Sequence, residues 1–76
     1  MLEQLGIVEY HECRGKYLKV RRLVEQATHD PHVQTQIYQL LFRNGGRCDC
    51  TVDRNVVRDP HKLAEVEAGI GRVLAL

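Results

Sequence analysis

Apolar residues recur at spacings of three and four between Ile7 and His29, which is the pattern of an amphipathic helix. Gly15 falls outside this stripe, and glycine in a helix interior is less favourable than alanine by about 1 kcal/mol. We therefore predict one long helix over residues 7–29, and the sequence leaves its continuity at Gly15 open. The stripe consists of Tyr10, Cys13, Tyr17, Val20, Val24 and Ala27.

Two Asp-Pro pairs predict where two further helices begin. In Asp30-Pro31 and in Asp59-Pro60 a capping carboxylate precedes a proline, whose missing N–H does no harm at the first helical position. The first of these helices should end near Asn44-Gly45, with the glycine in the left-handed conformation. The residues expected to be buried are Val33, Ile37, Leu40 and Leu41 in the first helix and Leu63, Val66, Ile70, Val73 and Leu74 in the second.

The segment of residues 47–57 is rich in Thr and Val, and its pattern fits an extended chain. Such a chain would turn Cys48, Cys50 and Val52 to one face. A strand needs a partner for its backbone groups, either residues 5–10 or the same strand of a second chain. We predict a mainly α fold: one domain over residues 1–76, a small bundle of about three helices, and one short extended or β segment around residues 47–57.

Length and charge limit what the chain can be. With 76 residues it builds a marginal core, so we expect a homo-oligomer, most simply a homodimer. The first residues lack the basic region and apolar run of a secretion signal, which predicts a cytoplasmic protein with reduced thiols. No apolar run is long enough to span a bilayer, so we expect no membrane partner. A net charge of +1 gives no general reason to expect nucleic acid.

Two segments carry a resemblance to a known group of proteins. They are His11-Glu12-Cys13-Arg14-Gly15 and Asn44-Gly45-Gly46-Arg47-Cys48-Asp49-Cys50. Together they make the chain similar to short uncharacterised bacterial proteins that carry a Gly-Gly-x-Cys-Asp-Cys segment after a helical region. The resemblance implies no activity. It implies only that Cys13 and the Cys-x-Cys motif belong to one unit.

The cysteines and histidines raise the hypothesis of a zinc site. Cys13, Cys48 and Cys50 with one histidine would supply a Cys₃His ligand set, with zinc as the cofactor. Candidates for the fourth ligand are His29, His32 and His61. The spacing argues against zinc, because zinc folds usually place two to four residues between neighbouring cysteines. We therefore expect no cofactor, with zinc as the alternative.

A redox role for Cys48 and Cys50 is a second hypothesis. A disulfide across one residue closes a tight ring, and strained disulfides are the labile ones. Arg47 and Arg54 nearby would favour the thiolate. No helix is predicted to begin directly after the pair, which argues against this role. The remaining interpretation is that all three cysteines are small core residues.

Five cations crowd the first predicted helix, as in some nucleic-acid-binding helices. On a helix they would surround the polar face rather than form one ridge, which argues against DNA or RNA as a partner. These candidates are Arg14, Lys16, Lys19, Arg21 and Arg22.

The sequence favours a non-catalytic interaction or regulatory module with a protein partner, and nothing in it orients a base onto a thiol as an enzyme would require. The alternatives are a thiol-dependent protein that uses Cys13, Cys48 and Cys50, and a nucleic-acid-binding helical protein. We expect the aromatic side chains to fill the interface between helices. They are Tyr10, Tyr17, Tyr38 and Phe42.

Overall fold

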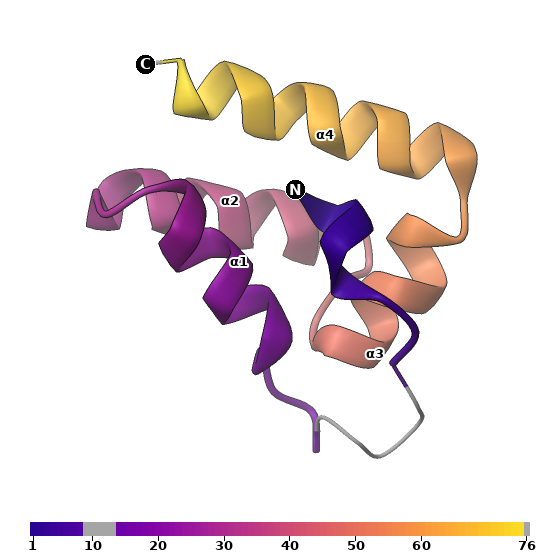
Figure 1. Cartoon of the computed structure of the whole chain (residues 1–76). Coiled ribbons are helices and arrows are strands. Elements are labelled where there is room, and N and C mark those ends of the chain that lie inside the picture. The colour runs from indigo at the N-terminus through magenta and orange to yellow at the C-terminus, as the bar shows by residue number, and fades with distance from the viewer. Residues whose placement is uncertain (9–13, 76) are drawn as a thin grey trace.

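The computed structural model describes residues 1–8 and 14–75, and this part of the chain is helical and contains no strand. The predicted mainly α fold is confirmed. Figure 1 shows the helices in chain order. They are a 3₁₀ helix η1 (Leu2–Leu5), α1 (Lys19–Ala27), α2 (Pro31–Arg43), α3 (Asp49–Val52), a π-helix η2 (Asp53–Val57) and α4 (Pro60–Leu74).

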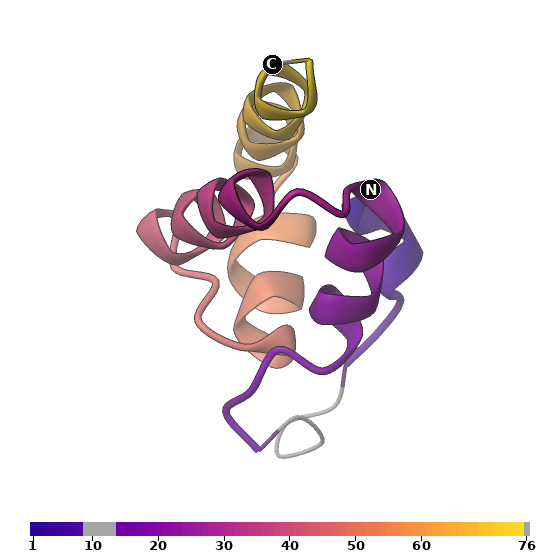
Figure 2. The ribbon, with the colours of Figure 1, turned by 90° about the vertical axis from the view of Figure 1, so that its left-hand side faces the viewer.

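The helices enclose one core. α4 packs across α2, while η1 packs against α1 and η2. Figure 2 shows α1 and α2 on either side of the segment formed by α3 and η2, with α4 above them. None of the described helices is both long and apolar enough to cross a membrane. The fully buried apolar side chains at the centre are Leu2, Val20, Val24, Ile37, Leu41, Val52, Val56 and Val66.

The long helix predicted over residues 7–29 is wrong, because α1 begins only at Lys19. Arg14 and Gly15 both have positive φ angles, of 51° and 75°. Two successive residues with positive φ cannot belong to a right-handed helix. Within α1 the stripe is confirmed at Val20 and Val24, which are buried, but not at Ala27, which is exposed. Tyr10 and Cys13 lie outside the described residues.

Both predicted Asp-Pro helix starts are confirmed. The Asp30 carboxylate accepts the N–H of His32 at 2.9 Å, and the Asp59 carboxylate accepts the N–H of His61 at 3.1 Å. The end of α2 is also as predicted, since Gly45 follows Asn44 with a φ of 88°.

The extended segment predicted around residues 47–57 is wrong, because residues 49–57 form α3 and η2. The Thr51 hydroxyl accepts the N–H groups of Arg47 and Cys48 at 2.8 and 2.9 Å, and these bonds draw the chain into a helical turn at that point. A dimer ribbon built on this segment therefore has no strand to form it. The homodimer itself stays a prediction.

Candidate functional site

Asp49 joins α3 to the start of α1. Its carboxylate accepts the N–H groups of Leu18, Lys19 and Val20 at 3.1, 2.6 and 3.1 Å. Its own N–H donates to the carbonyl oxygen of Lys16 at 3.1 Å. Helix starts carry unpaired N–H groups and partial positive charge, so a carboxylate there is favourable. Asp49 is 1% exposed and therefore acts as a buried cap for a helix other than its own.

Cys48 and Cys50 lie on either side of this cap. Their sulfur atoms are 3.2 Å apart, and each residue is only 7% exposed. The expectation that no helix begins beside the pair is wrong, because Cys48 is the N-cap residue of α3. Both side chains belong to the apolar core, which agrees with the interpretation of the cysteines as core residues. In addition to being core residues, the two cysteines place their thiols in direct contact.

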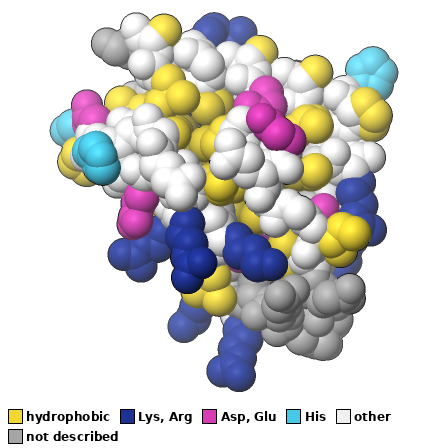
Figure 3. Space-filling view, viewed as in Figure 1, with side chains coloured by type: hydrophobic (Ala, Val, Ile, Leu, Met, Phe, Trp, Pro, Cys, Tyr) yellow, Lys and Arg dark blue, Asp and Glu magenta, His cyan; other side chains and the backbone are white. Residues whose placement is uncertain are grey.

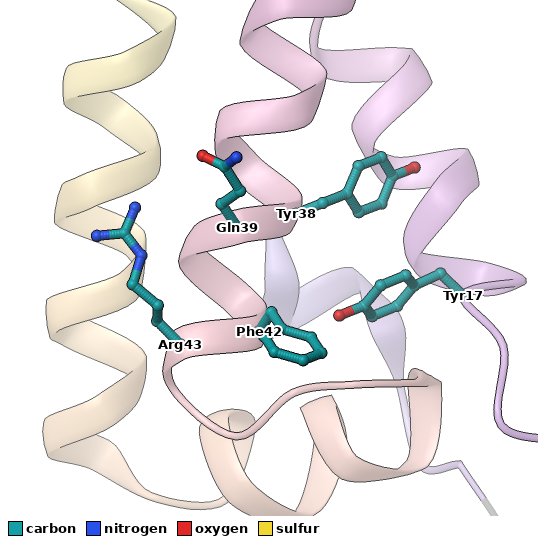
Figure 4. A pocket seen from close by; sticks show the side chains of 5 residues that line it. All are labelled: Tyr17, Tyr38, Gln39, Phe42 and Arg43. Carbon is teal, nitrogen blue, oxygen red and sulfur yellow. The ribbon is translucent and has the colours of Figure 1, made fainter.

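An apolar cavity of about 320 Å³ opens over the carboxyl-terminal half of α2. Figure 4 shows Tyr17 and Tyr38 on the side of α2 that faces α1, and Gln39 and Arg43 on the side that faces α4. The two tyrosine rings stack with centroids 5.3 Å apart and planes inclined by 28°. Phe42 completes the lining and is 55% exposed, so its predicted place inside a helix interface is wrong.

A hydrogen bond positions Tyr17, and burial affects both tyrosines of the cavity. The Tyr17 hydroxyl donates a hydrogen bond to the Gly46 carbonyl oxygen, which fixes the ring against the turn after α2. Burial raises the pKa of both Tyr17 and Tyr38 above the usual value for tyrosine. The Arg47 guanidinium lies 5.0 Å from the centre of the Phe42 ring, within the range of a cation–π contact. One wall of this cavity is therefore aromatic, and the Arg47 guanidinium lies beside it.

A second cavity of about 470 Å³ lies between α2 and α4 and shares Gln39 and Arg43 with the first. Arg72 of α4 lines it as well, and no carboxylate appears among the described residues that line either cavity. We call the combined lining the α2 groove; it consists of Tyr17, Gln36, Tyr38, Gln39, Leu40, Phe42, Arg43, Gly69, Arg72 and Val73.

The nucleic-acid candidates do not lie on one continuous helix. Arg14 and Lys16 precede α1, while Arg21 pairs with Glu25 at 2.9 Å. Lys19 and Arg22 line a separate cavity of about 280 Å³ between η1 and α1. Figure 3 shows lysine and arginine side chains gathered at the end of the molecule where α1 begins. The nucleic-acid role stays an untested alternative.

The zinc candidates are only partly within the described residues. Among residues 1–8 and 14–75, no group of three His, Cys, Asp or Glu side chains lies close enough together to hold a metal ion. His29 lies between α1 and α2, whereas His32 and His61 are the second residues of α2 and α4. Because Cys13 lies outside the described residues, the predicted Cys₃His set stays a prediction.

Two features of the site were not predicted from the sequence. One feature of the sequence pointed to the cap formed by Asp49. Residues 14–18 contain no Ser, Thr, Asp or Asn that could cap α1 locally, so its cap has to come from elsewhere in the chain. The α2 groove had a weak signal, because Phe42 lies off the predicted apolar face of its helix, and it is exposed in the structure.

Comparison with protein-family models, with curated proteins and with solved structures finds no significant match to this chain. The resemblance to short bacterial proteins with a Gly-Gly-x-Cys-Asp-Cys segment stays a prediction. The function is therefore inferred from geometry.

Proposed function

We propose that this protein is a non-catalytic interaction module that binds an acidic, apolar segment of a partner protein in the α2 groove. The main support for the proposal is that an aromatic wall and two arginines, Arg43 and Arg72, line the same groove. The described lining of this groove contains no carboxylate. Tyrosine and arginine are enriched among the few residues that contribute most of the binding energy at protein interfaces. The partner supplies the opposite charge.

The charges of the groove select among ligands. Aromatic pockets also bind quaternary ammonium groups, but Tyr17 and Tyr38 stack on each other rather than forming an open box. Arg43 in the same lining would repel a cation. A carboxylate beside an aliphatic side chain meets both the arginines and the apolar wall. A cavity of about 320 Å³ is small for a ligand site, which suits one or two side chains of a peptide.

The test is a titration with a short acetylated, amidated peptide in which Glu alternates with Leu. The chain contains no Trp and three Tyr, so a Tyr10→Phe variant reports binding through the fluorescence of Tyr17 and Tyr38. We expect this peptide to bind at least about tenfold more tightly than the same peptide with Lys in place of Glu. Equal affinities, or no binding of the acidic peptide, would contradict the proposal.

Two substitutions locate the binding surface. Phe42→Ala removes an exposed ring and should weaken the acidic peptide about tenfold while leaving the fold intact. Arg43→Gln should reduce the preference for Glu over Lys. Arg22→Gln is the matched control, because Arg22 lines a different cavity. A free chain that forms a dimer lost on Phe42→Ala substitution would place a second copy in the groove and overturn the proposal.

A further inference from the structure

The contact between Cys48 and Cys50 is close enough for a bond to form with a small movement. Their sulfurs are 3.2 Å apart, and a disulfide requires about 2.05 Å. Two thiolates on one tetrahedral zinc ion, each at about 2.3 Å from the metal, would stand about 3.8 Å apart. The sulfurs are thus already closer than such a metal would hold them.

We propose that Cys48 and Cys50 are a reversible disulfide site, and that closing the disulfide loosens the cap that Asp49 provides to α1. This inference does not rest on the proposed binding of an acidic segment. The oxidant is a hydroperoxide, and hydrogen peroxide is small enough to reach side chains of residues that are 7% exposed.

The chemistry is that of thiol oxidation in two steps. Hydrogen peroxide transfers one oxygen to the first thiol, which becomes a sulfenic acid, and one water is released. The sulfur of the second thiol attacks the sulfenic sulfur and displaces its hydroxyl group, which leaves with the second thiol proton as another water. The two thiols lose two electrons and two protons in total, and the peroxide becomes two waters. A dithiol reductant reverses the change by thiol–disulfide exchange.

Asp49 couples this bond to α1 because it is the residue between the two cysteines. Cys48 has an extended backbone with φ of −155° and ψ of 175°, and Cys50 lies in the first turn of α3. The disulfide closes a ring that contains the Asp49 backbone, so the small rotations that close it fall at and beside Asp49. Its carboxylate holds the N–H groups of Leu18, Lys19 and Val20, and its N–H holds the Lys16 carbonyl. A rotation there pulls the acceptor away from the donors.

The experiment uses the full chain with Cys13→Ala, so that only Cys48 and Cys50 can form an internal disulfide. The protein is treated with hydrogen peroxide, and mass spectrometry follows the loss of two hydrogens and its reversal by a dithiol reductant. Amide hydrogen exchange is then measured in both states. We expect the protection of Lys19 and Val20 to fall about tenfold on oxidation, while Ile70 in α4 keeps its protection.

The control adds Cys50→Ala to the same chain, and in it peroxide should not change the protection of Lys19. If that variant does not fold, the comparison of reduced and oxidised Cys13→Ala protein still decides the question. Unchanged protection in the disulfide form would overturn the coupling. Oxidation that yields only sulfinic acid or disulfides between chains, or that requires denaturant, would overturn the site.

Discussion

The carboxylate of Asp49 accepts the N–H of Lys19 at 2.6 Å, although the two residues are 30 positions apart in the chain. This bond ties the first turn of α1 to the first turn of α3. Tyr17, two residues before the start of α1, lies on the wall of the α2 groove. One buried carboxylate thus positions both the thiol pair and the aromatic surface.

Removing the Asp49 carboxylate should destabilise the protein strongly. Asp49→Ala leaves three N–H groups without their acceptor, two of them in α1, and we expect it to lower the free energy of unfolding by about 2–4 kcal/mol. Chemical denaturation measures this change. Asp59→Ala removes an exposed local cap of α4 and should cost only about 1 kcal/mol. Equal losses for the two substitutions would contradict the role of Asp49 as a buried cap of α1.

Thr51→Val tests the helical start at residue 48. The substitution keeps a β-branched side chain of similar volume but removes the oxygen that accepts the N–H groups of Arg47 and Cys48. We expect a loss of about 1–2 kcal/mol in the free energy of unfolding. A stabilising effect would instead favour the extended segment, because valine has a high strand propensity.

Two glycines of α4 should respond in opposite ways to alanine. A Cβ at Gly71 meets nothing within 4 Å, so Gly71→Ala should raise the free energy of unfolding by about 0.5 kcal/mol. A Cβ at Gly69 would lie 2.7 Å from Cδ2 of Leu40, so Gly69→Ala forces the Leu40 side chain to move. We therefore expect Gly69→Ala not to raise the free energy of unfolding. Thermal unfolding of the two variants shows which of them is more stable. A more stable Gly69→Ala protein would contradict the close packing of α4 on α2.

The two groove tyrosines, Tyr17 and Tyr38, should ionise at a higher pH than free tyrosine. Burial raises the folded-state pKa of Tyr17 and Tyr38 above the ordinary value of 10.0. The unfolded chain therefore loses phenolic protons first as the pH rises. Their contribution to stability is complete below pH 10 and is lost as the pH rises through the higher folded-state pKa values. Ultraviolet titration of a Tyr10→Phe variant should show ionisation above pH 10, and a midpoint at or below that pH would contradict the burial of the rings.

The parts of the fold that local chemistry determines were predictable. Asp30 and Asp59 bond to N–H groups two residues ahead, so the sequence alone revealed both helix starts. The segment of residues 47–57 was mispredicted because Cys48, Cys50 and Val52 alternate as they would in a strand. In the structure they are buried within a short helical segment that is enclosed on several sides.

The buried acids show why the site could not be predicted in full. Asp49 and Asp53 are polar residues in positions that an extended chain would turn to solvent. Both are buried because their partners come from distant segments, the start of α1 for Asp49 and the Val8 N–H for Asp53. Spacing along the chain contains no information about such partners. Phe42 was misplaced because it is aromatic, although it lies off the predicted apolar face of α2, and it is exposed.

The most direct test of the proposed function is a nuclear Overhauser measurement on the complex with the Glu and Leu peptide. We expect contacts between the leucine methyl protons and the ring protons of Phe42 and Tyr38. We also expect these contacts to disappear when Lys replaces Glu in the peptide. Contacts that fall instead on the exposed Leu18 or Ile7, with none to Phe42, would contradict binding in the α2 groove.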